Sequence, residues 1–323
     1  MILVTGATGL LGNNVVRELV HRKEQVRVLI RENSERRPLE NLPIEVAIGD
    51  VCDQKSVFNA CKGISAVIHA AAVVHLGHSK KELQKQVNVG GTQNVAEEAL
   101  KAEARLVHIS SIDTLATGTA KEFATEETLG QRLPSCPYVD TKSEAEEVVL
   151  EYAAKGLSAT IVNPGFMLGP WDWKPSSGKM LIEVSRKFTP AAPLGGFNLC
   201  DVRDVTAGIL AALVKGKVGQ RYILGGHNLS FLDGWKLFAK VTNTRPPFCK
   251  AGPLATYLGG VIGDFVTKLT GKEPDVNSVA TKLSKYRRFL SSQRAIDELG
   301  YSIRPAEDSV KDAWQWFQDY GYV

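Results

Sequence analysis

The sequence predicts an α/β protein: a doubly wound parallel sheet of the Rossmann type with helices on both faces, plus a smaller, mostly helical C-terminal substrate lobe. Short apolar runs alternate with amphipathic stretches through the first half of the chain, which is the pattern of βαβ units. A glycine-rich turn, residues 5–12, directly follows the first apolar run. The length of 323 residues exceeds that of a usual single domain, roughly 100 to 200 residues, and leaves room for a second lobe.

The individual elements follow from this alternation. Strands are expected at residues 2–4, 25–30, 44–48, 66–70, 106–109 and 159–162, and helices at 13–20, 81–100 and 138–154. Several strands are apolar throughout, as expected when helices cover both faces of a parallel sheet. After Pro164, residues 171–193 are rich in Trp, Pro, Lys and Gly, which is typical of an insertion over a ligand site. We therefore assign residues 1–163 and 198–226 to the Rossmann domain, and residues 164–197 and 227–323 to the substrate-binding lobe.

The composition is that of an ordinary globular protein. Hydrophobic residues make up 44% of the chain and charged residues 23%, which excludes disordered and fibrous classes. The net charge of +4 is spread over interleaved basic and acidic residues, so nucleic acid is not an expected partner. Five cysteines without a Cys-x-x-Cys pair favour a reducing compartment. Because the first strand starts at Met1 with no leader, we expect a cytoplasmic protein.

The residue pattern predicts neither a membrane span nor a metal site. No apolar run reaches the roughly 20 residues that cross a bilayer, so no integral membrane segment is expected. The longest candidate, residues 251–263, is expected to pack in the core or against a second subunit, and an interfacial or lid helix is the alternative. His69, His75 and His78 have no carboxylate cluster to complete a metal shell, so no metal is expected.

The glycine-rich turn predicts a binding site for the pyrophosphate of a dinucleotide. Gly6, Gly9 and Gly12 follow a strand and open a helix, and this context gives weight to their spacing. Glycine permits a sharp turn and a close approach of the backbone, and the helix N-terminus offers free N–H groups to an anion. Thr8, Leu10 and Leu11 complete the turn. The alternative is a tight strand-to-helix turn that binds no ligand.

The end of the second predicted strand indicates which dinucleotide is bound. An acidic residue there accepts from a ribose hydroxyl, whereas an arginine pairs with the 2′-phosphate of NADP. Arg31 occupies that place, with Arg36 and Arg37 in the same loop, so NADP(H) is favoured over NAD(H). Glu32 leaves NAD open, in which case the arginines form a solvated loop.

Two more strand ends complete the predicted cofactor site. Asp50 and Val51 follow the third strand and are placed to border the adenine. The run Ala70, Ala71 and Ala72 follows the fourth strand, where small side chains let the phosphates and ribose approach closely.

A tyrosine and a lysine are candidates for acid–base chemistry. Tyr138 and Lys142 lie at i and i+4, on one face of a predicted helix. Tyrosine has an ordinary pKa of about 10, and a nearby ammonium favours the phenolate, so the pair can act as general acid or base closer to neutral pH. Ser111, at the end of the fifth strand, is placed to hydrogen-bond the same substrate oxygen. The spacing alone also fits a surface tyrosine beside an ordinary helical lysine.

In their order along the chain, these motifs resemble those of the extended short-chain dehydrogenase/reductases, the NAD-dependent epimerase/dehydratase superfamily. The matching residues are 5–12, Asp50, 70–72, Asn88 within 87–92, Ser110–Ser111, Tyr138 with Lys142, and 163–165. Residues 29–31, Arg37 and residues 110–113 are most similar to the dihydroflavonol reductase and hydroxysteroid dehydrogenase branch. Residues 163–172 and 221–226 resemble bacterial hopanoid-associated sugar epimerases.

The resemblance implies catalytic roles. Tyr138 would donate a proton to a carbonyl oxygen in reduction, or remove one in oxidation. Lys142 would lower the pKa of Tyr138 and hold the nicotinamide ribose. Ser111 would polarise the carbonyl, and Asn88 would support Lys142 through a bound water.

The resemblance also implies how the nicotinamide is oriented and how subunits associate. The backbone that would face the nicotinamide ring belongs to Pro164, Gly165, Phe166 and Met167. In related enzymes the helix that carries the catalytic tyrosine often forms a dimer face, so a homodimer is the corresponding expectation.

The substrate is expected at the carboxyl edge of the sheet, beneath the insertion that follows Pro164. The predicted walls are Val73, Val74, His75, Asp113, Thr114, Phe166, Trp171, Trp173, Leu181, Phe197 and Asn198. Aromatic and aliphatic types predominate, which favours an apolar carbonyl compound over a nucleotide sugar. A sugar diphosphate would require paired arginines. Arg186 and Arg203 could supply them, although pairing with neighbouring acids is the simpler reading of Arg203.

The leading functional hypothesis is an NADPH-dependent oxidoreductase. It would reduce a ketone or aldehyde of a small, fairly apolar substrate, or oxidise the corresponding alcohol. The nearest enzymatic alternative is a nucleoside-diphosphate-sugar epimerase or dehydratase with tightly bound NAD(P). An alternative of another class is a non-catalytic NADP(H)-sensing regulator. Ser111, Tyr138 and Lys142 argue against it, because a sensor has no use for the acid.

Overall fold

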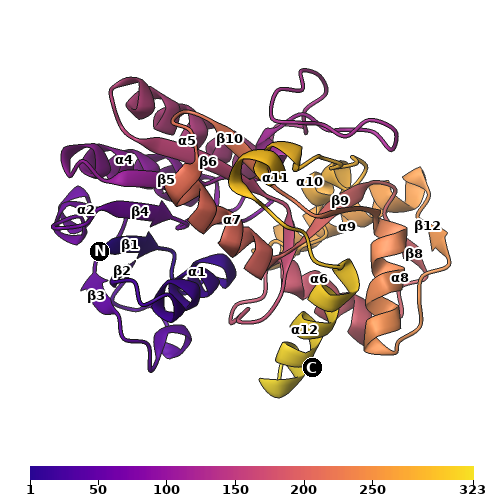
Figure 1. The fold of residues 1–323 in the computed structure, drawn as a ribbon. Helices are drawn as coiled ribbons and strands as arrows, with labels where there is room; N and C mark the ends of the chain where they lie inside the picture. The colour runs from indigo at the N-terminus through magenta and orange to yellow at the C-terminus, as the bar shows by residue number, and fades with distance from the viewer.

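The computed structural model describes residues 1–323, and its largest element is a seven-stranded parallel sheet with the order β10-β6-β5-β4-β1-β2-β3. Its strands are β1 (Ile2–Thr5), β2 (Val26–Ile30), β3 (Glu45–Ile48), β4 (Ala66–His69), β5 (Arg105–Ile109), β6 (Ala159–Pro164) and β10 (Arg221–Leu224). The helices α1 (Leu10–His21), α2 (Gln54–Ala60), α4 (Gly91–Lys101), α5 (Pro137–Ala154) and α7 (Val202–Lys215) flank the sheet (Figure 1). The strand order reverses between β1 and β4, the place where a doubly wound sheet binds its ligand.

The two faces of the sheet pack into separate cores. Ile2 and Val4 of β1 belong to the core formed with α1 and α7, whereas Leu3 belongs to the core formed with α2, α4 and α5. Because both faces are covered, consecutive residues of β1 are all buried, which explains the unbroken apolar runs in the sequence. The predicted fold class is therefore confirmed.

The C-terminal lobe is built on a three-stranded sheet, β11-β9-β7, and three helices. The elements are β7 (Phe166–Leu168), β9 (Gly196–Asp201), β11 (His227–Ser230), α6 (Ser177–Arg186), α8 (Phe231–Thr242) and α12 (Ala306–Asp319). Leu181, Phe197, Phe238 and Phe317 are fully buried and form the centre of its core. This core is separate from the two that flank the parallel sheet.

The remaining elements are mostly short. They are η1 (Arg37–Leu39), α3 (Lys81–Gln84), η2 (Lys85–Gly90), η3 (Ile112–Thr114), β8 (Ala191–Ala192), β12 (Cys249–Lys250), α9 (Pro253–Thr270), α10 (Ser278–Leu283) and α11 (Gln293–Leu299). The expectation that residues 251–263 pack in a core is wrong, because the large side chains of α9 are exposed and only Gly260 and Gly263 are buried. No helix of the structure combines the length and the apolar character that a bilayer crossing requires.

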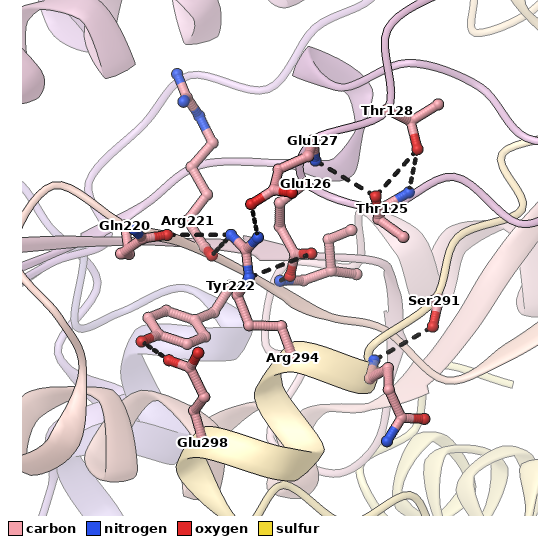
Figure 2. Close-up of polar contacts among 12 residues, drawn as sticks. Thr125, Glu126, Glu127, Thr128, Gln220, Arg221, Tyr222, Ser291, Arg294 and Glu298 are labelled. Carbon is pink, nitrogen blue, oxygen red and sulfur yellow. Dashed lines mark hydrogen bonds and ion pairs between the residues drawn. The ribbon is translucent and has the colours of Figure 1, made fainter.

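Arg294 of α11 holds the long loop between η3 and α5 against the edge of the sheet (Figure 2). Its guanidinium donates to the side chains of Gln220 and Glu127. The neighbouring Glu126, buried beneath this contact, accepts the N–H of Ile223 at 2.8 Å. Because β10 is an edge strand, this N–H points away from the sheet and depends on the loop for a partner.

Candidate functional site

The turn between β1 and α1 requires glycine at two of its positions. Gly6 has a φ of +70°, and a Cβ there would lie 2.6 Å from the backbone of Ala70. A Cβ at Gly12 would lie 2.2 Å from the carbonyl oxygen of Gly6. A Cβ at Gly9 would lie 3.5 Å from the same oxygen, which is an ordinary contact. Packing within the chain therefore explains Gly6 and Gly12 but leaves Gly9 without an internal steric reason.

The N-terminus of α1 fits a bound anion. Gly9 is the N-cap residue, and no side chain caps the helix or places a negative charge in its first turn. The N–H groups of Leu10, Leu11 and Gly12 precede the first helical hydrogen bond, which Asn13 donates to Gly9. Free donors at the positive end of the helix dipole suit the pyrophosphate of a dinucleotide. Thr8 lies in the same turn and is partly exposed.

The other predicted strand-end residues border this turn. Residues 70–72 follow β4, and the N–H groups of Ala70 and Ala71 donate to the carbonyl and the hydroxyl of Thr5. Asp50 and Val51 follow β3. The carboxyl ends of β1, β3 and β4 thus bring the glycine turn, the acidic residue and the alanine run to one edge of the sheet.

The three arginines predicted to bind a phosphate do not converge. Arg31 and Arg36 are exposed and form no ion pair. Burial raises the pKa of the Cys52 thiol to about 11, and Arg31 opposes this shift, which places its guanidinium beside the loop after β3. The Arg37 guanidinium instead lies 4.6 Å from the ring centre of Trp173 in the C-terminal lobe. Arg37 is therefore engaged elsewhere, whereas the guanidiniums of Arg31 and Arg36 have no ion-pair partner within the chain.

Helix α5 brings Tyr138 beside Ser111, which follows the carboxyl end of β5. Both residues are 8% exposed. Burial raises the pKa of the Tyr138 hydroxyl, and the Asp113 carboxylate adds to this shift, while Ser111 and Arg288 oppose it. Tyr138 is therefore protonated at neutral pH, which is the state that a general acid requires.

Lys142 lies one helical turn after Tyr138, but its ammonium points elsewhere. Its Nζ donates to the carbonyl oxygen of Ile109 at 2.8 Å. Burial lowers the pKa of Lys142 to about 8, and Glu146 opposes this shift. The resemblance implies that Lys142 lowers the pKa of Tyr138. In this structure burial has the largest effect on that pKa, and burial raises it.

Asn88 positions the segment after β4 against α5. Its side-chain carbonyl accepts the N–H of Val73 at 2.8 Å, and its amide donates to the carbonyl of Val73 at 3.2 Å and to Thr141 at 3.1 Å. It lies in η2, a turn of π-helix inserted between α3 and α4. Its implied support of Lys142 through a water stays a prediction.

Glu146 and Asn163 are positioning residues: Glu146 was not predicted from the sequence, and Asn163 was predicted only as part of the motif at residues 163–165. The Glu146 carboxylate is buried and accepts hydrogen bonds of 2.7 Å from Thr114, Asn163 and Arg221. The Asn163 amide also donates to the backbone carbonyl of Ser111 at 2.9 Å. A buried carboxylate thus fixes the strand end that presents Ser111. The spacing of four residues from Lys142 to Glu146 was the available signal.

The predicted nicotinamide-facing segment, residues 164–167, lies where the chain leaves the parallel sheet. Pro164 ends β6, and Phe166 begins β7 of the C-terminal lobe. Between them, the N–H of Gly165 donates to the carbonyl of Leu224, and a Cβ at Gly165 would lie 2.6 Å from the carbonyl oxygen of Asn198. A residue without a side chain is needed because both sheets approach this position closely.

Five of the predicted pocket walls are used for packing instead. Leu181 lies in the core of the C-terminal lobe, and Asn198 is buried and donates to Asn228. Phe197 is enclosed in the core of the C-terminal lobe. Trp173 is buried edge-on against Trp316, with ring centres 5.2 Å apart. Thr114 is buried and donates to Glu146. The prediction that they line the pocket is corrected, because remote residues such as Phe238, Trp316 and Glu146 enclose them and the local sequence does not reveal these neighbours.

Three other predicted wall residues lie at the boundary between the sheet and the C-terminal lobe. Val74 is exposed, and His75 forms a hydrogen bond of 2.8 Å with Glu273. Asp113 forms an ion pair with Arg288, with 2.9 Å between Oδ1 and Nε. Glu273 and Arg288 lie in irregular segments on either side of α10 and follow no periodic pattern, so neither residue could be predicted from its surroundings in the sequence.

Trp171 lies at the same boundary in an unusual backbone conformation. Its φ is +69°, in the left-handed region that a non-glycine residue rarely adopts. The guanidinium of Arg17, from α1, lies 3.4 Å from the centre of its ring. A cation–π contact thus fixes the start of the C-terminal lobe against the helix that follows the glycine turn.

Two features define the class of this protein. One is a turn suited to an anion at the switch point of the sheet, and the other is the buried set of Ser111, Tyr138 and Lys142 at the adjoining strand end. Together they are typical of the Rossmann-fold dehydrogenases and reductases of the short-chain type. The chain belongs to the NAD dependent epimerase/dehydratase family, whose model matches residues 2–225. It is an NAD(P)-dependent enzyme of the extended type, as the resemblance implied.

Several known proteins are similar over nearly the whole chain. The protein is 33% identical to a putative dihydroflavonol 4-reductase of Synechocystis sp., with 99% of this chain and 95% of the relative covered. It is 32% identical to sterol demethylase protein B of Methylococcus capsulatus, with 99% of each chain covered. The crystal structure of gox2253 is 34% identical, with a TM-score of 0.86, and the match covers 99% of this chain and 98% of that one. The similarity therefore includes the C-terminal lobe.

Proposed function

We propose that the protein is an NADP-dependent oxidoreductase that reduces a ketone or aldehyde of a small, largely apolar substrate, or oxidises the corresponding alcohol. The observation that carries the proposal is the buried, protonated Tyr138 hydroxyl beside Ser111, at the sheet edge that also holds the glycine turn. In reduction, Tyr138 gives its proton to the carbonyl oxygen while Ser111 donates a hydrogen bond to it. The nicotinamide, when bound, supplies the hydride.

The proposed cofactor site combines the strand-end residues. The residues that would hold the dinucleotide are Gly6, Thr8, Gly9, Leu10, Leu11, Gly12, Arg31, Arg36, Asp50, Val51, residues 70–72, Lys142 and residues 164–167. Arg31 and Arg36 are free to pair with a 2′-phosphate, which supports NADP over NAD. Lys142 would turn from the carbonyl of Ile109 to the ribose.

The apolar substrate class is supported by the contacts of Arg186 and Arg203, the two arginines considered for a sugar diphosphate. Arg203 is paired with Asp201 at 2.7 Å and with Asp312 at 2.6 Å, and Arg186 donates to the carbonyl of Tyr322. Neither is free for a sugar diphosphate. The relatives named for a dihydroflavonol and a sterol, both polycyclic compounds, support the same class.

The test is cofactor consumption by the purified protein with NADPH and a panel of aldehydes and ketones. Tyr138→Phe should lower kcat by at least about a hundredfold, the usual contribution of a general acid, while cofactor binding is kept. Tyr152→Phe, on the same helix but away from Ser111, is the matched control and should leave kcat unchanged. Cofactor binding without consumption across the panel, combined with turnover of a nucleotide sugar, would establish the epimerase alternative instead.

Cofactor preference is tested by a second pair of variants. Arg31→Asp should shift the preference from NADPH toward NADH, because it replaces a phosphate ligand by a ribose-hydroxyl acceptor. Arg37→Asp should change the preference less, because the Arg37 guanidinium lies over Trp173. An unchanged preference in Arg31→Asp would remove Arg31 from the phosphate site.

A further inference from the structure

Helix α9 presents its large apolar side chains to solvent. Apolar residues recur at i, i+3 and i+4 along its 18 residues, the pattern of a helix with one apolar face. The members of this face with the greatest exposure, 48–70%, are Leu254, Tyr257, Leu258, Ile262, Phe265 and Leu269. Monomeric proteins rarely expose so large a continuous apolar surface unless it is an interaction site.

The inner face of α9, opposite the apolar one, packs closely on neighbouring residues and so keeps the apolar face turned to solvent. A Cβ at Gly263 would lie 1.9 Å from the carbonyl oxygen of Val276, and one at Gly260 would lie 2.5 Å from the hydroxyl of Thr281. Asp264, on the same inner face, accepts the N–H of Ser278 at the start of α10. The small and polar residues are therefore required on the inside, and the helix cannot rotate to bury its apolar face.

The unpaired charges at the two ends of α9 have one sign. Glu273 and Asp275, which follow the helix, are paired with His75 and Lys179. Residues 245–272 contain four basic side chains, Arg245, Lys250, Lys268 and Lys272, all exposed and without an ion pair. The only acid in this stretch is Asp264, which is turned inward. An apolar helical face flanked by unpaired cations is complementary to an anionic lipid surface.

We propose that α9 docks this protein on an anionic membrane. The helix lies in the plane of the interface, with its apolar face in the acyl boundary and the flanking cations on lipid headgroups. A second copy of the chain is the less suitable occupant, because a two-fold interface through this face would bring two sets of unpaired cations together.

The docking face adjoins the catalytic side chains. Helix α9 packs on α10, and Leu283 of α10 belongs to the apolar cluster that encloses Tyr138. A membrane-bound α9 would therefore hold the apolar cluster around Tyr138 close to the lipid surface. The docking itself does not rest on the proposed reaction, so either can fail without the other.

The test is flotation of the full-length protein with vesicles of phosphatidylcholine, with and without phosphatidylglycerol. The wild type should float with the anionic vesicles, and less so at high salt. Ile262→Gln with Phe265→Gln should lower the partition coefficient at least about tenfold, because two large side chains no longer enter the lipid. Leu129→Gln with Val214→Gln removes two exposed apolar side chains outside α9 and should float like the wild type.

Further measurements separate the outcomes. Lys268→Glu with Lys272→Glu should abolish the preference for anionic vesicles. Cofactor binding and thermal unfolding should be unchanged in all variants, which distinguishes lost docking from lost folding or lost function. Failure of the wild type to float, or equal flotation of Ile262→Gln with Phe265→Gln, would overturn the proposal. So would a wild-type dimer in analytical ultracentrifugation that this double variant dissociates without any vesicle binding, because the occupant would then be a second copy.

Discussion

Lys142→Met should make the cofactor-free protein more stable at neutral pH while it removes a residue of the proposed site. The native state lowers the pKa of Lys142 from 10.5 to about 8 by burial, a shift that corresponds to about 3 kcal/mol of unfavourable free energy for the charged side chain. Methionine does not bear this penalty. It does lose the hydrogen bond to the Ile109 carbonyl, which costs about 1 to 2 kcal/mol. We expect a net gain of about 1 to 2 kcal/mol near pH 7.

The gain should reverse at alkaline pH. Between the native pKa of about 8 and the unfolded value of 10.5, the native state binds fewer protons at Lys142 than the unfolded state does. Wild-type stability therefore rises with pH through this window relative to the variant. Above it, the wild type should be the more stable protein, because its neutral amine keeps the hydrogen bond.

Urea unfolding of both proteins at several values from about pH 7 to about pH 10 measures this crossing. Lys155→Met, beyond the C-terminus of the same helix and exposed, is the control and should give a difference that does not change with pH. A stability difference between wild type and Lys142→Met that stays constant across this range would refute the argument from burial.

Three other changes test separate parts of the structure. Gly9→Ala should leave the stability unchanged but weaken dinucleotide binding, measured by fluorescence titration, because its Cβ has space within the chain but would face the pyrophosphate; equal binding would place the pyrophosphate elsewhere. Asp113→Asn should lower the pKa of Tyr138 and move the pH profile of alcohol oxidation toward acid, and an unmoved profile would contradict the assigned acid. Glu126→Ala should cost about 1 to 3 kcal/mol in urea unfolding, because the N–H of Ile223 on the edge strand loses its partner; a loss near zero would mean that water replaces the carboxylate.

The cofactor half of the protein could be predicted from the sequence because its requirements are local. Gly6 has a φ of +70°, and a Cβ at Gly12 would meet the carbonyl oxygen of Gly6, so both needs arise within one turn, which occurs at a fixed place between a strand and a helix. The apolar runs of the sheet follow from burial on both faces, which needs no knowledge of the partner strands. The family match to residues 2–225 covers this half and extends over residues 164–197 of the C-terminal lobe.

The substrate half could not be predicted to the same extent because its contacts are remote. Phe197, Trp173 and Thr114 have residue types suited to a pocket, but distant helices and the Glu146 carboxylate enclose them. Likewise, the place of Arg37 in the loop after the second strand suits a phosphate site, but its guanidinium lies over the ring of Trp173 in the C-terminal lobe. An amphipathic pattern gives the apolar face of a helix such as α9 but not which way that face points.

Two polar contacts cross the boundary between the sheet and the C-terminal lobe beside Tyr138. Asp113 is paired with Arg288, and His75 is hydrogen-bonded to Glu273. Each contact joins a loop after a parallel strand to a segment that flanks α10. The side chains of both contacts are only 9–20% exposed, so each contact is screened less by water than a surface pair would be. Asp113 raises the pKa of Tyr138 and Arg288 lowers it. The acid strength of Tyr138 therefore depends on a charged pair that joins the sheet to the C-terminal lobe.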